Sequence, residues 1–199
     1  MISTRTLTVA AVVTIALSSS VCAQTQRVRG TLEKVEGNTL TVKPKEGASL
    51  TLKLTDKAQI VAVVKASLAD IKPGDYIGSG AVPQADGSQK AVEVHIFAAV
   101  QRGTGDGHRT GWPGAANGTM TNGEVGDAVI NVDGGVLTVK YKGGEKKIIV
   151  TPGIRIVRYV ITDRSELKPG ATISVTNALK KPDGTFEVAR INVGRDIAP

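Results

Sequence analysis

An internal repeat constrains the fold of this chain more than any other feature. The segment Gly37–Lys43 (GNTLTVK) returns 97 residues later as Gly134–Lys140 (GGVLTVK). Two further pairs keep this spacing to within one residue: Lys72-Pro73-Gly74 with Lys168-Pro169-Gly170, and Asp86-Gly87 with Asp183-Gly184. Self-similarity at a fixed spacing over most of a chain predicts two copies of one structural unit.

Each copy has the pattern of β structure. Apolar residues alternate with Thr and Lys on both sides of a glycine-containing turn, which is typical of a half-buried hairpin. These residues are Leu40, Val42, Leu50, Leu52 and Leu54 in the first copy, and Leu137, Val139, Ile148 and Val150 in the second. A β-branched run follows in each copy, at residues 59–64 and 155–161. We therefore expect five or six short strands in each copy.

The end of each copy is marked by a turn and a last strand. Proline disfavours helix at the lysine before it, so Lys-Pro-Gly predicts at most one helical turn and then a tight turn. The alternation places Val92, Val94 and Ile96 inside the first copy, and Ala189, Ile191 and Val193 inside the second.

These patterns predict an all-β protein of two tandem small OB-like β-barrel domains joined by a Gly-rich linker. The expected bounds are a signal peptide at 1–23, a first domain at 24–100, a linker at 101–120 and a second domain at 121–199. A β-sandwich is the alternative architecture. Units of this size bury little surface, so we expect the copies to pack on each other or on another subunit of a homo-oligomer.

The first 23 residues have the pattern of a signal peptide. A single positive charge at Arg5 precedes an apolar stretch and then small residues that end in Val21-Cys22-Ala23. This predicts cleavage between Ala23 and Gln24, and a periplasmic or secreted protein. Lipidation of Cys22 is the competing interpretation, although Val21 stands where a lipobox has Gly, Ala or Ser.

Composition excludes several functional classes. One cysteine cannot form an internal disulfide, and two histidines are too few for a Cys/His metal cluster. The 25 basic and 18 acidic side chains are spread evenly over both copies, and aromatic residues make up only 3% of the chain. Binding of nucleic acid would favour clustered charge and stacking platforms, so we expect no nucleic-acid partner.

Catalytic patterns are also lacking. The chain has no Gly-x-Ser-x-Gly elbow, and its one cysteine lies in the predicted signal peptide. We expect no catalytic residues and no enzyme, with a small hydrolase as the least favoured hypothesis. The pI of about 9.6 favours contact with anionic surfaces of the cell envelope.

The segment between the copies carries the most specific motifs. Together with the signal peptide and the repeat, Arg102–Arg109 (RGTGDGHR) and Thr119–Asn122 (TMTN) resemble a family of small exported bacterial proteins. That family is built from a repeated domain of unknown function with a predicted OB-like barrel, and its members often carry an automatic label related to metal transport. The resemblance implies an exported location and this fold. It implies no role for any residue, and Thr110–Pro113 departs from the family pattern in the linker.

His108 is the best-placed candidate for a functional side chain, because long Gly-rich segments between compact units often carry function. Imidazole and carboxylate together suit divalent metals, so His108 with Asp106, and His95 as a third ligand, form a candidate metal site. Alternation places His95 outside the barrel wall, on the face of Glu93.

Two functional hypotheses follow. The first is a non-catalytic exported binding or scaffold module that holds a small ligand or an envelope protein in the cleft between the copies. In this hypothesis the linker contributes contacts from Arg109 and Trp112, and no cofactor is needed. The alternative is a periplasmic metal-binding accessory protein that uses His108 and takes a divalent metal.

Overall fold

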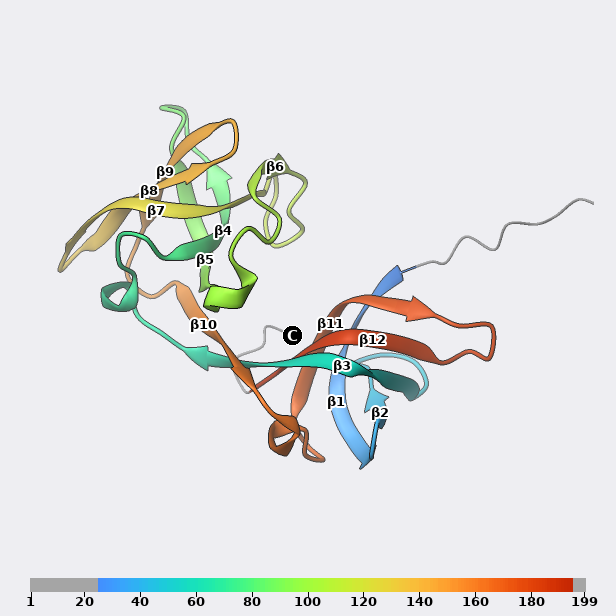
Figure 1. The fold of residues 1–199 in the computed structure, drawn as a ribbon. Coiled ribbons are helices and arrows are strands. Elements are labelled where there is room, and N and C mark those ends of the chain that lie inside the picture. Colours follow the sequence, from blue (N-terminus) through green and yellow to red (C-terminus); the bar gives the residue numbers. More distant parts are fainter. Residues whose placement is uncertain (1–24, 195–199) are drawn as a thin grey trace, which may run out of the picture.

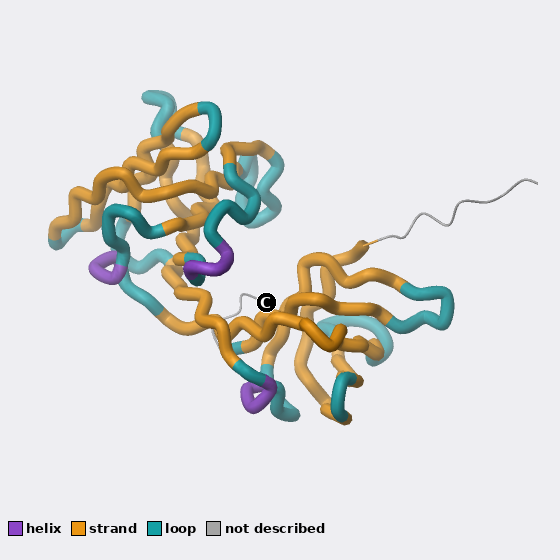
Figure 2. Tube along the Cα trace, viewed as in Figure 1, coloured by secondary structure: helices purple, strands orange, loops and turns teal. Residues whose placement is uncertain are grey.

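The computed structural model describes residues 25–194 (Figure 1). The predicted signal peptide, its cleavage site and Cys22 lie outside these residues. The described chain is all-β, with three single-turn 3₁₀ helices (Figure 2). The strands are β1 (Thr25–Glu36), β2 (Thr39–Lys43), β3 (Leu50–Lys65), β4 (Tyr76–Pro83), β5 (Gln89–Ile96), β6 (Gly107–Thr110), β7 (Thr119–Asn131), β8 (Gly134–Tyr141), β9 (Gly144–Val150), β10 (Arg155–Thr162), β11 (Thr172–Lys180) and β12 (Phe186–Val193). The 3₁₀ helices are η1 (Leu68–Asp70), η2 (Ala99–Gln101) and η3 (Arg164–Glu166).

The strands form one continuous sheet that closes on itself at both ends. Ring 1 has the order β1-β2-β3-β12-β11 and returns to β1, and ring 2 has the order β7-β8-β9-β5-β4 and returns to β7. In each ring one neighbouring pair is parallel, β3 with β12 and β9 with β5, while the other pairs are antiparallel. Closure leaves few free strand edges.

Each ring encloses its own apolar core, and both cores draw on both halves of the chain. Leu32 and Leu52 from the first half pack with Ile173 and Ile191 in ring 1. Ile77 and Ile96 pack in ring 2 with Leu137, Val139 and Ile148. Ring 2 is formed by one uninterrupted stretch, 76–150, whereas ring 1 combines residues from either side of it. Neither core is therefore confined to residues 24–100 or to residues 121–199.

Two strands connect the rings. β3 and β10 cross between the two lobes in Figure 1 and pair antiparallel, with Ile60–Lys65 opposite Val157–Thr162. Val63 lies opposite Tyr159 within this segment. Further along its length β10 also pairs with β5 of ring 2, so the connection is continuous with both rings.

The predicted turns are present. A single 3₁₀ turn, η1 or η3, precedes each Lys-Pro-Gly segment, and both Gly74 and Gly170 have φ of +88°. A side chain is strained in this conformation, so the turn requires glycine at both positions.

The predicted core positions of the last strands are wrong at one residue in each copy. Val92 and Ala189 are exposed, whereas the preceding residues Ala91 and Val188 lie in the cores. The register shifts at both places. Val92 is one extra residue opposite β4, a β-bulge that reverses the alternation of β5. Opposite β3, Ala189 stands against four residues, 55–58, and the alternation of β12 reverses at this larger irregularity.

Part of the segment predicted as a linker forms β structure. β6 pairs antiparallel with β7, which begins at Thr119, so this segment forms a hairpin on ring 2. Trp112 lies over Gly80 of β4, where an added Cβ would come within 2.4 Å of the indole. Glycine at this position therefore lets the hairpin lie against the ring.

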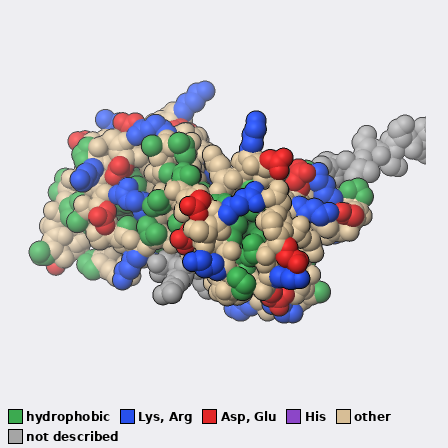
Figure 3. Space-filling model, turned by 60° about the horizontal axis from the view of Figure 1, so that its bottom comes forward, with side chains coloured by type: hydrophobic (Ala, Val, Ile, Leu, Met, Phe, Trp, Pro, Cys, Tyr) green, Lys and Arg blue, Asp and Glu red, His purple; other side chains and the backbone are tan. Residues whose placement is uncertain are grey.

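The surface carries mixed charge. Basic and acidic side chains are interspersed over the face shown in Figure 3. Within residues 25–194, no helix has the length and apolar character needed to cross a membrane.

Candidate functional site

A groove lies between the two rings. It consists of two adjoining cavities of about 620 and 320 Å³, which share lining residues from both rings, among them His95, Tyr159 and Asn192. We call this the inter-ring groove, with Arg27, Arg29, Ser174, Arg190 and Asn192 on the ring 1 wall and Glu93, His95, Met120 and Asn122 on the ring 2 wall. Phe97, Arg109 and Tyr159 also line it. Its volume suits a small molecule.

The ring 1 wall follows from strand alternation. Val28 points into the core, so Arg27 and Arg29 on either side of it point outward. Arg29 lies opposite Ser174 of β11, and Ser174 lies opposite Asn192 of β12. A row of polar side chains thus crosses three adjacent strands.

The ring 2 wall has a corresponding row in which Asn122 of β7, Gly78 of β4 and His95 of β5 lie opposite one another. An added Cβ on Gly78 would come within 2.1 Å of His95 Nε2, so the histidine fills the space that glycine leaves. The His95 ring stacks on Tyr159 with centroids 5.2 Å apart and meets Phe97 edge-on at 4.8 Å.

The expectation for His95 needs correction. It lies outside the ring 2 core, as alternation predicts, but it is only 8% exposed because Tyr159 and Phe97 cover it. Burial, followed by the charges of Arg155 and Arg109, lowers the pKa of His95 to about 4. At neutral pH the imidazole is therefore uncharged.

This lowered pKa predicts a pH-dependent stability. The unfolded chain binds the His95 proton near pH 6.5 and the folded chain only near pH 4, so acid favours unfolding between these values. We expect the free energy of unfolding to fall by roughly 3 kcal/mol as the pH drops from 7 to 4. Urea denaturation at each pH measures the change.

The matched control for this experiment is His95→Asn. Four aspartates with lowered pKa values, Asp70, Asp86, Asp163 and Asp183, titrate in both proteins, so subtraction isolates the histidine. Equal pH dependence in the two proteins would contradict the assignment.

The groove is positively charged. Arg27, Arg109 and Arg190 form no ion pair with another residue of the described chain. Arg109 donates to the Gly105 carbonyl at 2.8 Å, and Arg190 donates to Gln59 Oε1 at 3.2 Å. Such bonds orient the guanidinium groups without neutralising them.

Acidic groups do not offset this charge. Within the described part of the chain, Glu93 is the one carboxylate that lines the groove, and it pairs with Arg155 at 3.1 Å. A buried acceptor is left over on the ring 2 wall: Asn122 is 4% exposed and its Nδ2 donates to the Thr104 carbonyl at 3.0 Å, but its Oδ1 has no partner within residues 25–194. Buried polar atoms are normally hydrogen-bonded, so this unpartnered oxygen is an exception on the ring 2 wall.

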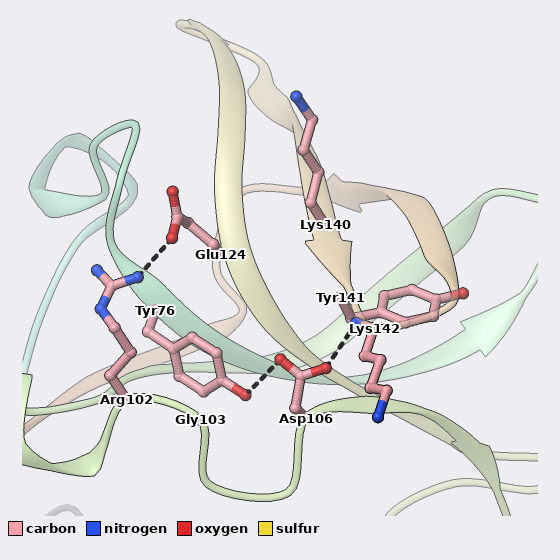
Figure 4. A pocket seen from close by; sticks show the side chains of 8 residues that line it. All are labelled: Tyr76, Arg102, Gly103, Asp106, Glu124, Lys140, Tyr141 and Lys142. Carbon is pink, nitrogen blue, oxygen red and sulfur yellow. Dashed lines mark hydrogen bonds and ion pairs between the residues drawn. The ribbon is translucent and has the colours of Figure 1, made fainter.

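A second, more open pocket of about 440 Å³ lies on ring 2 beside the predicted linker (Figure 4). Asp106 accepts hydrogen bonds from the Tyr76 hydroxyl at 3.2 Å and from the Lys142 amide at 2.7 Å. Burial and the Asp106 charge raise the pKa of Tyr76 to about 12. Arg102 pairs with Glu124 at 2.6 Å. These polar groups are therefore paired with one another, and the contacts attach the predicted linker to ring 2.

The three residues of the metal hypothesis do not converge. Asp106 lies in the pocket of Figure 4, and His95 lies in the inter-ring groove. His108 Nδ1 lies 2.8 Å from Thr121 Oγ1, and its ring stacks on Tyr141 with centroids 6.3 Å apart. Over residues 25–194, no three His, Cys, Asp or Glu side chains are grouped so that they could hold a metal ion. Metal binding stays a prediction.

The two predicted contact residues of the linker both lie at the groove. Arg109 lines both cavities, and Trp112 lines the smaller one. Sequence reasoning missed Arg27, Arg29 and Arg190, since the first two are far from Arg190 along the chain and each is an ordinary outward-facing residue. The one available signal was that Arg27 and Arg29 lie on the same face of a strand.

Known proteins offer no further guide to the groove. The chain matches no known protein family, no curated protein and no solved structure. The proposals below therefore depend on the geometry of this chain.

Proposed function

We propose that this protein is a non-catalytic exported binding protein that holds an anionic ligand in the inter-ring groove. The observation that carries the proposal is the convergence of Arg27, Arg29, Arg109 and Arg190 on a groove in which Glu93, the one lining carboxylate among residues 25–194, is already paired. Guanidinium groups bind carboxylate and phosphate in a bidentate manner, which gives both affinity and orientation.

We also propose that the rings are the OB-like barrels of a duplicated unit that have exchanged their last two strands. In each ring a three-stranded meander from one copy is completed by two strands from the other. The backbone bonds at the exchange correspond: Gly170 N donates to Leu32 O at 2.7 Å, and Gly74 N donates to Val125 O at 2.8 Å. The groove then lies between the copies, and β6 adds Arg109.

The test is the affinity for tripolyphosphate, measured by calorimetry at low salt. We expect the double variant Arg27→Gln/Arg190→Gln to bind at least tenfold more weakly than the unchanged protein, because each lost charged hydrogen bond contributes about 1.5–3 kcal/mol. The control variant Lys45→Gln/Lys57→Gln removes the same charge from exposed positions outside the groove and should bind normally.

Equal weakening in both double variants would show that the affinity depends on net charge alone. That result, or an absence of binding to the unchanged protein, would contradict a specific anion site in the groove.

A further inference from the structure

The inter-ring groove has two walls of different chemistry, although they are built from corresponding positions of the repeat. Asn192 stands 97 residues after His95, and Arg190 stands 97 residues after Glu93. Ser174 stands 96 residues after Gly78. Ser174 faces Asn192 across ring 1, and Gly78 faces His95 across ring 2. The two copies therefore present the same faces with different side chains.

The ring 1 wall is cationic and hydrophilic. It presents Arg27, Arg29 and Arg190 together with the hydroxyl of Ser174 and the amide of Asn192. Each of these side chains can donate a hydrogen bond to an oxyanion. No acidic residue of ring 1 lines either cavity.

The ring 2 wall is nearly uncharged and rich in rings. His95 is neutral and packs with Phe97 and Tyr159, and Met120 lies beside them along the groove. The carboxylate of Glu93 is occupied by Arg155. Asn122, whose amide oxygen has no partner within residues 25–194, also lines the larger cavity.

We propose that the groove binds a small aromatic or heterocyclic ring that carries a phosphate or carboxylate group. This inference rests on the proposed function and names the kind of anion. The anionic group lies against Arg27 and Arg190, and the hydrogen bond to Gln59 orients the Arg190 guanidinium. The ring lies against Met120, Phe97 and Tyr159. The larger cavity, about 620 Å³, has room for both parts.

The test compares three probes by NMR titration of the ¹⁵N-labelled protein: inorganic phosphate, phenyl phosphate and phenol. We expect phosphate to shift backbone amides of β1 and β12 only. Phenyl phosphate should shift the same amides and also those of β5 and β7, with at least tenfold higher affinity than phosphate. Phenol alone should bind much more weakly than phenyl phosphate.

Two variants assign the two halves of the ligand. Arg27→Gln, an exposed position, should weaken phosphate and phenyl phosphate by similar factors. Met120→Gln, at a half-buried position of similar volume, should reduce the advantage of phenyl phosphate and leave phosphate unchanged. The amide spectra show directly that each variant is folded.

The outcomes separate this inference from the proposed function. Phenyl phosphate that binds no more tightly than phosphate, with shifts confined to ring 1, would overturn the inference and leave an anion site in place. Binding of neither probe in the groove would overturn both.

Discussion

Cleavage of the folded chain between β6 and β7 leaves its two halves bound to each other as one particle. Each ring takes three strands from one half and two from the other, so the halves share two apolar cores. The antiparallel pair of β3 and β10 adds a further joint. Separation would expose both cores to water, at a cost far above the few kcal/mol that hold a transient complex.

The experiment inserts a protease recognition sequence after Ala116, in the exposed turn before β7. We expect the cleaved protein to elute from gel filtration at the position of the intact protein, and its fragments to separate only in denaturant. The stability should become dependent on concentration, because folding is then a bimolecular step. Elution of two independent half-size particles would contradict the exchange of strands between the halves.

A disulfide trap provides the matched control. Arg29 lies directly opposite Ser174 across β1 and β11, a separation that a disulfide can span. The variant Arg29→Cys/Ser174→Cys should therefore link the halves, so that they run together on a nonreducing gel after cleavage. In Arg29→Cys/Asn192→Cys the partner lies one strand further away, about 10 Å, and no bond should form.

A serine at Gly78 destabilises the fold by about 1–3 kcal/mol. Its Cβ would lie 2.1 Å from His95 Nε2 and 2.7 Å from Asn122 Oδ1. The histidine cannot yield cheaply, because it is buried between Tyr159 and Phe97. Overpacking of a filled site usually has an effect of this size, which the urea midpoint measures.

Ring 1 suggests a second substitution that should restore the stability lost in Gly78→Ser. At the corresponding place Ser174 faces Asn192, so a serine fits where an asparagine replaces the histidine. We expect Gly78→Ser/His95→Asn to recover most of the stability that Gly78→Ser loses, relative to His95→Asn alone. Additive losses in the double variant would contradict the steric explanation.

The sequence predicted the all-β class and the local features well, because those depend on neighbours along the chain. Alternation, turn glycines and the proline after each lysine act within a few residues, and the structure has the expected turns at Gly74 and Gly170. The pairing of strands that are distant along the chain could not be predicted in this way. β4 and β11 each follow a Lys-Pro-Gly segment, so this local signal cannot decide which of them completes ring 1. The pairing of β11 with β1 joins residues far apart along the chain.

The site was only partly predictable for the same reason. Gly-rich sequence indicated Arg109 and Trp112, and both lie at the groove. Arg27 and Arg190 belong to strands far apart along the chain, and they line one cavity because β1 and β12 lie in the same ring. The bulge at Val92 likewise depends on pairing with β4, which no residue of β5 reveals by itself.

Along the sequence, ring 2 is inserted between the two segments that form ring 1. This order has a mechanical consequence. Ring 2 occupies residues 76–150, and the strands nearest residues 25 and 194 both belong to ring 1. A pulling force applied at those two positions is carried by ring 1 and by the crossing strands before it reaches ring 2. An unfoldase or processive protease that engages either of these strands should therefore unfold ring 1 first, and a ligand bound in the proposed site would lose Arg27, Arg29 and Arg190 before ring 2 unfolds.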